Sequence, residues 1–136
     1  MRAQNNRRYC MKKVIGFAVI LLFMAGVVHA KAYETSITAG GYNVSVSIDH
    51  NPPVIGENTV TVEIRDASGK PVRDAKVELY TVMPSMPAMN ATTVATPKGS
   101  KYTAVIKPSM GGEWAVTVSF KGSDGKVRKG TFKFVI

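Results

Sequence analysis

The sequence predicts an all-β fold, an immunoglobulin-like antiparallel β-sandwich of about seven strands. Three observations support this prediction. From residue 42 onward, apolar and polar residues alternate with a period of two in one short segment after another. Segments rich in Gly and Pro separate these runs at regular spacing. No segment after residue 30 has the periodicity of an amphipathic helix.

The first three expected strands show the alternation most clearly. In YNVSVSI (42–48), apolar residues occupy every second position, and NTVTVEIRD (58–66) and AKVELYTV (75–82) repeat the pattern. The segments between them, DHNPPVIGEN (49–58) and ASGKPVRD (67–74), contain the Gly and Pro residues typical of chain reversals. Each strand is therefore expected to bury one face.

Four further strands are expected in the second half of the chain. A short, weak strand is predicted over residues 92–96, followed by KYTAVIK (101–107), WAVTVSF (114–120) and GTFKFVI (130–136). The turns PKGS (97–100), KPSMGGE (107–113) and KGSDGK (121–126) divide them.

The first thirty residues resemble a cleavable signal peptide. An uncharged apolar run, residues 14–28, follows five basic residues and is shorter than the roughly 20 residues of a membrane-spanning helix. Small residues come next, so we expect cleavage after Ala30 or Ala32, leaving a domain over residues 33–136. An uncleaved anchor is the alternative, and Met11 is an alternative start. The protein is thus expected to be periplasmic or otherwise extracytoplasmic.

Export would change both the charge and the cysteine content. Without residues 1–30 the chain has thirteen basic and nine acidic residues, a net charge of +4, and no basic run that would indicate a nucleic-acid partner. Cys10 is the only cysteine and would be removed. Disulfides, thiolate catalysis and cysteine metal sites are therefore excluded, and one hydrophobic core must stabilise the domain.

A methionine-rich segment, YTVMPSMPAMNATTV (80–94), is predicted to form a non-helical loop because two prolines interrupt it. Alternate connections in an antiparallel sandwich fall at the same end. The connections after the first, third and fifth expected strands should therefore meet there, beside the start of the sixth. They bring together the candidate site residues His50, Met83, Met86, Met89, Met110 and Trp114.

These residue types suit Cu(I), because thioether sulfur and imidazole are soft or borderline ligands and thiols are readily oxidised outside the cell. An indole ring nearby would shield the metal or contact it through its π face. A structural interpretation is also open: the methionines would seal the end of the sandwich, His50 would be an ordinary turn residue, and Trp114 would belong to the core.

Several motifs resemble the YtkA-like family of exported domains, which is related to the FixH-like proteins. They are GEN before the second expected strand, DASGKPV at a turn, MPSMPAM, the Tyr of GSKYTA, and MGGEW. The resemblance implies a small extracytoplasmic sandwich, in a family whose members also occur on periplasmic adaptors of metal efflux pumps and near cytochrome oxidase assembly. It implies roles for Met83, Met86, Met89, Met110 and Trp114, whereas His50 rests on loop position alone.

No catalytic set can be assembled from the exported residues, so we expect a binding protein and not an enzyme. Asp49 beside His50 is the only adjacent acid–imidazole pair there. Two hypotheses remain open. The domain either binds or carries Cu(I) at its methionine-rich end, or uses the same end without metal to dock a membrane-bound efflux or oxidase-assembly protein.

Overall fold

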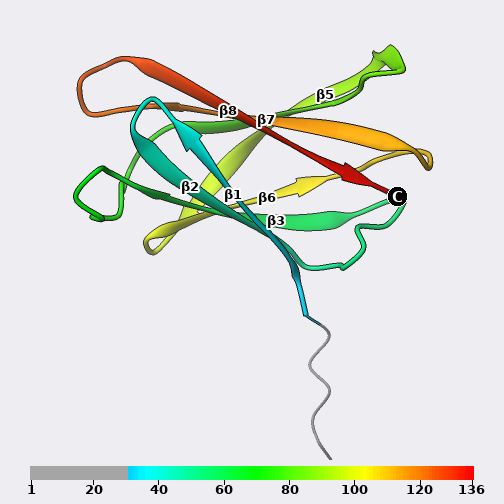
Figure 1. Ribbon diagram of the computed structural model, residues 1–136, viewed down its shortest axis with the longest axis horizontal. Helices are drawn as coiled ribbons and strands as arrows, with labels where there is room; N and C mark the ends of the chain where they lie inside the picture. Colours follow the sequence, from blue (N-terminus) through cyan, green and yellow to red (C-terminus); the bar gives the residue numbers. More distant parts are fainter. Residues whose placement is uncertain (1–30) are drawn as a thin grey trace, which may run out of the picture.

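The computed structural model describes residues 31–136, so the expected signal peptide and Cys10 lie outside the described residues. Within them the chain is all-β, and no helix is long and apolar enough to cross a membrane. Figure 1 shows the strands crossing in two layers. There are eight: β1 Tyr33–Ala39, β2 Tyr42–Ile48, β3 Asn58–Arg65, β4 Val77–Met83, β5 Met86–Lys98, β6 Lys101–Ile106, β7 Glu113–Lys121 and β8 Val127–Val135.

The strands follow the order β1-β2-β3-β6-β5-β4-β7-β8, and every pair is antiparallel. β5 joins the two layers. Its first part pairs with β4, whereas only residues 96–98 pair with β6. The predicted sandwich is therefore confirmed, with one long strand passing from one sheet to the other.

β1 and β8, at the two ends of this order, lie against each other through side chains. The Tyr33 hydroxyl donates to the Lys133 carbonyl at 3.0 Å. Gly130 faces Ile37 so closely that an added Cβ would lie 2.7 Å from the Ile37 Cδ1 atom. Beyond them, Arg128 contacts the β1–β2 turn and stacks 4.5 Å above the Tyr42 ring. These contacts close the side of the sandwich opposite β5.

Inward-facing residues of both sheets form one hydrophobic core between the layers. Tyr102 on β6 is fully enclosed, and its hydroxyl donates to the Val72 carbonyl at 2.8 Å and accepts from the Ala75 amide at 3.0 Å. It therefore holds the β3–β4 connection against the core. The largest fully buried side chains include Tyr102, Phe120, Ile48, Ile64, Leu79 and Ile106.

The structure corrects two details of the prediction. There are eight strands and not seven, because β1 (YETSITA) pairs with β2 along its whole length although only one of its residues is fully buried. The segment expected to be a methionine loop and a short strand at 92–96 is instead the tip of the β4–β5 hairpin and the thirteen-residue β5. Pro84 and Ser85 alone separate the two strands, and β4 supplies a pairing partner for residues whose own pattern is weak.

Candidate functional site

Three chain segments meet at one end of the sandwich, at the right of Figure 1. They are the β2–β3 connection, the tip of the β4–β5 hairpin and the β6–β7 connection. The Gly56 amide donates to the Pro108 carbonyl at 2.8 Å, which joins the first connection to the third. Gly112 and Ile136 exchange two backbone hydrogen bonds of 3.1 Å, which fix the third beside the C-terminus. We refer to Met83, Met86, Met89 and Met110 at this end as the methionine pole.

The β4–β5 hairpin supplies three of the four methionines. Met83 and Met86 are paired across the hairpin, next to an irregularity in the register after Val82. Met83 is buried in the core, and its Cε methyl lies against Gly112: an added Cβ there would be 2.5 Å away, at a backbone φ of +133°. Met86 is 46% exposed and Met89 is partly buried against the core. The hairpin thus presents one methionine outward and inserts another between the sheets.

Met110, on the β6–β7 connection, is the second exposed methionine, at 36%. Its backbone is fixed by Trp114, whose indole Nε1 donates to the Met110 carbonyl at 3.0 Å. Trp114 itself is only 3% exposed and belongs to the core. The indole therefore has a structural role, and it also sets where Met110 lies.

A pocket of about 250 Å³ opens beside Trp114, between the first part of β5 and the end of β6. Met89, Asn90 and Ile106 line it together with Trp114. Thr81 also lines it, and its buried hydroxyl has no hydrogen-bond partner within residues 31–136. The pocket exists because β5 leaves β6 after only three paired residues.

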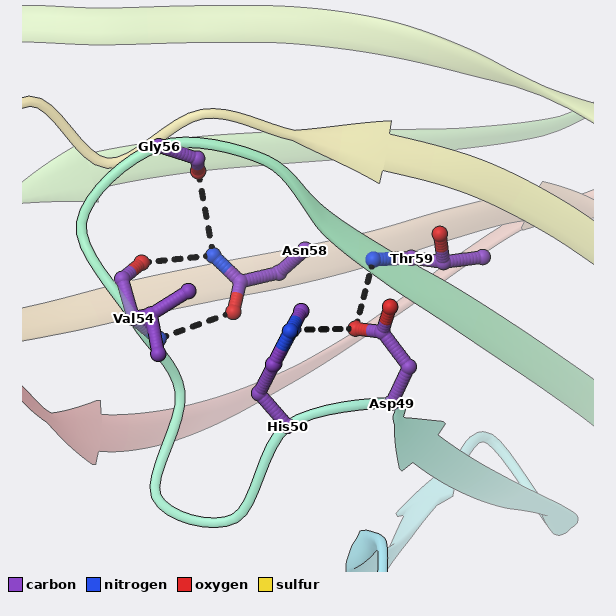
Figure 2. A network of polar contacts seen from close by, with 6 residues as sticks. All are labelled: Asp49, His50, Val54, Gly56, Asn58 and Thr59. Carbon is purple, nitrogen blue, oxygen red and sulfur yellow. Dashed lines mark hydrogen bonds and ion pairs between the residues drawn. The ribbon is translucent and has the colours of Figure 1, made fainter.

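His50 lies on the β2–β3 connection, and Figure 2 shows its ring directed toward Asp49. Its Nδ1 is 2.9 Å from the Asp49 Oδ1 atom, which also accepts the Thr59 amide at 2.9 Å. Asp49 is therefore the polar partner that orients the imidazole, which is about half exposed. The structure places His50 at the same end as the methionines, but the contact that holds its ring is to Asp49.

Asn58, the first residue of β3, shapes the connection that carries His50 (Figure 2). Its side chain is fully buried. The Oδ1 atom accepts the Val54 amide at 2.9 Å, and Nδ2 donates to the carbonyls of Val54 at 2.7 Å and Gly56 at 3.1 Å. Sequence reasoning missed this role, because GEN before an alternating strand shows only that a turn ends there. A buried Asn satisfying three backbone groups becomes visible only once the loop is folded.

Charged groups near the pole are paired with one another. Lys107 and Glu57 form an exposed ion pair at 2.8 Å, and the hydrogen bond from Lys107 lowers the pKa of the Glu57 carboxyl. Lys133 similarly meets Glu113 at 3.1 Å. Among residues 31–136, no group of three or more His, Cys, Asp or Glu side chains is arranged to hold a metal ion. The donors that the pole offers a metal are therefore chiefly neutral thioethers.

Comparison with known proteins adds a family and two structural neighbours. A family model described as YtkA-like matches residues 38–119. The PmoD soluble domain from Methylocystis aligns at a TM-score of 0.53 and 12% identity, covering 74% of this chain and 95% of its own. FetP from uropathogenic E. coli, recombinantly expressed in the periplasm, aligns at 0.50 and 10% identity, covering 79% and 97%. At these identities the likeness shows a shared fold. No curated protein matches the chain.

Proposed function

This chain belongs to the YtkA-like family. On that premise we propose that it is an exported, non-catalytic binding protein. It takes up Cu(I) at the methionine pole and releases it to an envelope partner. The basic and apolar N-terminal pattern supports export. Metal efflux and oxidase assembly are the processes that the family resemblance favours.

The observation that carries the proposal is the placement of Met86 and Met110. Met86 begins β5 at the hairpin tip and Met110 lies on the β6–β7 connection, both at one end of the sandwich, and both side chains are exposed. Thioether sulfur is a soft ligand that suits Cu(I), whereas Zn²⁺, Ca²⁺ and Mg²⁺ favour the imidazole, thiolate or carboxylate groups that are not clustered within residues 31–136. The thioether donors of Met86 and Met110 therefore favour Cu(I) over these three ions.

The other residues of the site have distinct proposed roles. Met89, partly buried beside Trp114, is placed to supply a third sulfur, and Met83 fixes the hairpin against Gly112. Trp114 positions Met110 through its backbone hydrogen bond. His50 is held by Asp49 and is proposed as an accessory ligand only. Because thioethers need no deprotonation, binding through them requires no proton release.

The first test is elemental analysis of the exported chain after Cu(I) loading under reducing conditions and removal of excess metal. We expect one copper ion per chain in the parent, and a clear loss in the Met86→Leu/Met110→Leu double variant. Leu nearly conserves the volume of Met, so the change isolates the sulfur atoms. An unchanged circular dichroism spectrum is the control for folding. No bound copper in the parent would reject the proposal.

A second candidate function has an observation of its own. Exposed apolar side chains gather at this end: Val54 and Ile55 on the β2–β3 connection, Met86, Met110, and Val135 near the C-terminus. Such a surface is typical of a protein-docking site. In this alternative the pole binds a membrane-bound efflux or oxidase-assembly protein without metal, and stoichiometric copper uptake separates the two functions.

A further inference from the structure

The outer edge of β5 lacks a strand neighbour over most of its length. One edge pairs with β4, but on the other only residues 96–98 pair with β6. β6 pairs with β3 along its other edge, over residues 102–106. Figure 1 shows β5 extending away from β6 toward the methionine pole. The Asn90 side chain donates to the Pro87 carbonyl at 2.9 Å and to the Ala88 carbonyl at 3.5 Å. The backbone groups of residues 89–95 that face this edge have no strand partner within residues 31–136, so they can pair with another chain.

This edge also lacks the charges that usually protect an edge strand from self-association. Residues 79–97 contain no Asp, Glu, Lys or Arg, the longest such run in residues 31–136. Within it, AMNATTVAT (88–96) contains neither Pro nor Gly, and Val94 is 59% exposed. High β-propensity without charge favours strand pairing. β1 and β8, the strands at the two ends of the sheet order, carry charged residues and lie against each other.

We propose that the β5 edge pairs antiparallel with the β5 edge of a second copy of this chain, forming a two-fold dimer. A second copy fits because the seam brings no like charges together, although residues 31–136 have a net charge of +4. Opposed residues of an antiparallel pair point to the same face, so a two-fold register sets one residue opposite its own copy.

Thr92 is the residue expected at the two-fold axis. Pairing centred there uses residues 89–95, and stops before the stretch already bonded to β6. It sets Asn90 opposite Val94 and the exposed Thr92 opposite the Thr92 of the second copy, a favourable cross-strand pair. A seven-residue seam buries less than the roughly 1,200 Å² of a stable interface, so the dimer is weak. Met89 is the last paired residue at each end of the seam, and Met83 and Met86 of the two copies lie beyond it at opposite ends.

The test is sedimentation velocity on the metal-free exported chain, from about 1 μM to about 1 mM. We expect a monomer at the lowest concentration and a rising dimer fraction. Thr92→Lys and Thr92→Glu should each weaken the dimer at least tenfold, because each places like charges opposite one another. An equimolar mixture of the two variants should restore it as a heterodimer. Thr38→Lys, an exposed threonine on β1, is the matched control and should leave dimerisation unchanged.

Three results would overturn the proposal: a monomer over the whole range, a parent dimer that Thr92→Lys does not weaken, or a mixture of the charged variants that does not associate. If the chain is a monomer throughout, the β5 edge would instead be a binding site for an extended segment of a different protein. The experiment contains no copper, so its outcome is independent of metal binding at the pole.

Discussion

Replacing Asn58 with Ala should destabilise the fold by about 3 kcal/mol. The fully buried side chain makes three hydrogen bonds to the β2–β3 connection, all within 3.1 Å (Figure 2). Each intramolecular hydrogen bond contributes about 1 kcal/mol net, and the backbone groups left behind have little access to water. Because domain stabilities are about 5–15 kcal/mol, this loss is a large share of the total.

Urea denaturation followed by the fluorescence of Trp114 would measure the change in the free energy of unfolding. Asn58→Asp should be at least as damaging, since it keeps the acceptor for the Val54 amide but places a carboxylate against two carbonyl oxygens. Asn43→Ala is the matched control: Asn43 is exposed, and its loss should change stability by less than about 0.5 kcal/mol.

The reasoning would be refuted if Asn58→Ala unfolded within about 0.5 kcal/mol of the parent. That result would mean that the connection keeps its shape without the amide. Hydrogen exchange provides a local readout as well, because the Val54 and Gly56 amides depend on Asn58 and on the connection it shapes. Both should exchange faster in the variant under native conditions.

Three further predictions concern stability. Trp114→Ala should cost about 3 kcal/mol or more in thermal or denaturant unfolding, because a core indole is removed; parent-like stability would contradict the core role. Tyr102→Phe should cost about 1–2 kcal/mol through its two lost hydrogen bonds, with near-identical circular dichroism spectra, and an unchanged midpoint would speak against it. The hydrogen bond from Arg128 holds the pKa of the Asp124 carboxyl well below its usual range. The ionised carboxylate therefore stabilises the fold at pH values above its unfolded-state pKa, and this stabilisation is lost as the pH falls. Asp124→Asn should therefore be less stable than the parent at pH 7, with a gap that narrows below about pH 4, and a constant gap would disprove the linkage.

Most of the fold could be predicted from the alternation of apolar and polar residues. Residues 44, 46 and 48 are buried in the first segment, and residues 114, 116, 118 and 120 are buried in 114–120 together with Ala115. This burial is what the alternating pattern predicts. The strand before the methionine segment, β4, pairs with the strand after MGGEW, β7. The meeting of three connections at one end follows from antiparallel topology alone.

The parts that were missed depend on pairing and not on burial. Only one of the thirteen residues of β5, Ala95, is buried, so the stretch of Thr, Ala and Asn after Met89 shows little alternation. Its strand character comes from hydrogen bonds to β4. The sequence also did not show which methionine side chains are exposed. The sequence did not distinguish Met83, inserted against Gly112, from Met86 three residues later, because the reversal at Pro84 and Ser85 decides which of them faces inward.

The most direct measurement of the central claim is a competition titration with a chromophoric Cu(I) chelator, carried out at pH 8 and pH 5 under reducing conditions. We predict that Met86→Leu and Met110→Leu each weaken the affinity at least tenfold, or about 1.4 kcal/mol, with folding intact. Met83→Leu is the matched control, which should lower stability more than affinity because Met83 is buried. The affinity corrected for the chelator should hardly change with pH, since thioethers do not protonate, and a marked loss at pH 5 would show that a ligand other than a thioether is essential. Unchanged affinity in both Met86→Leu and Met110→Leu would contradict the account and leave the exposed apolar end as a protein-docking surface.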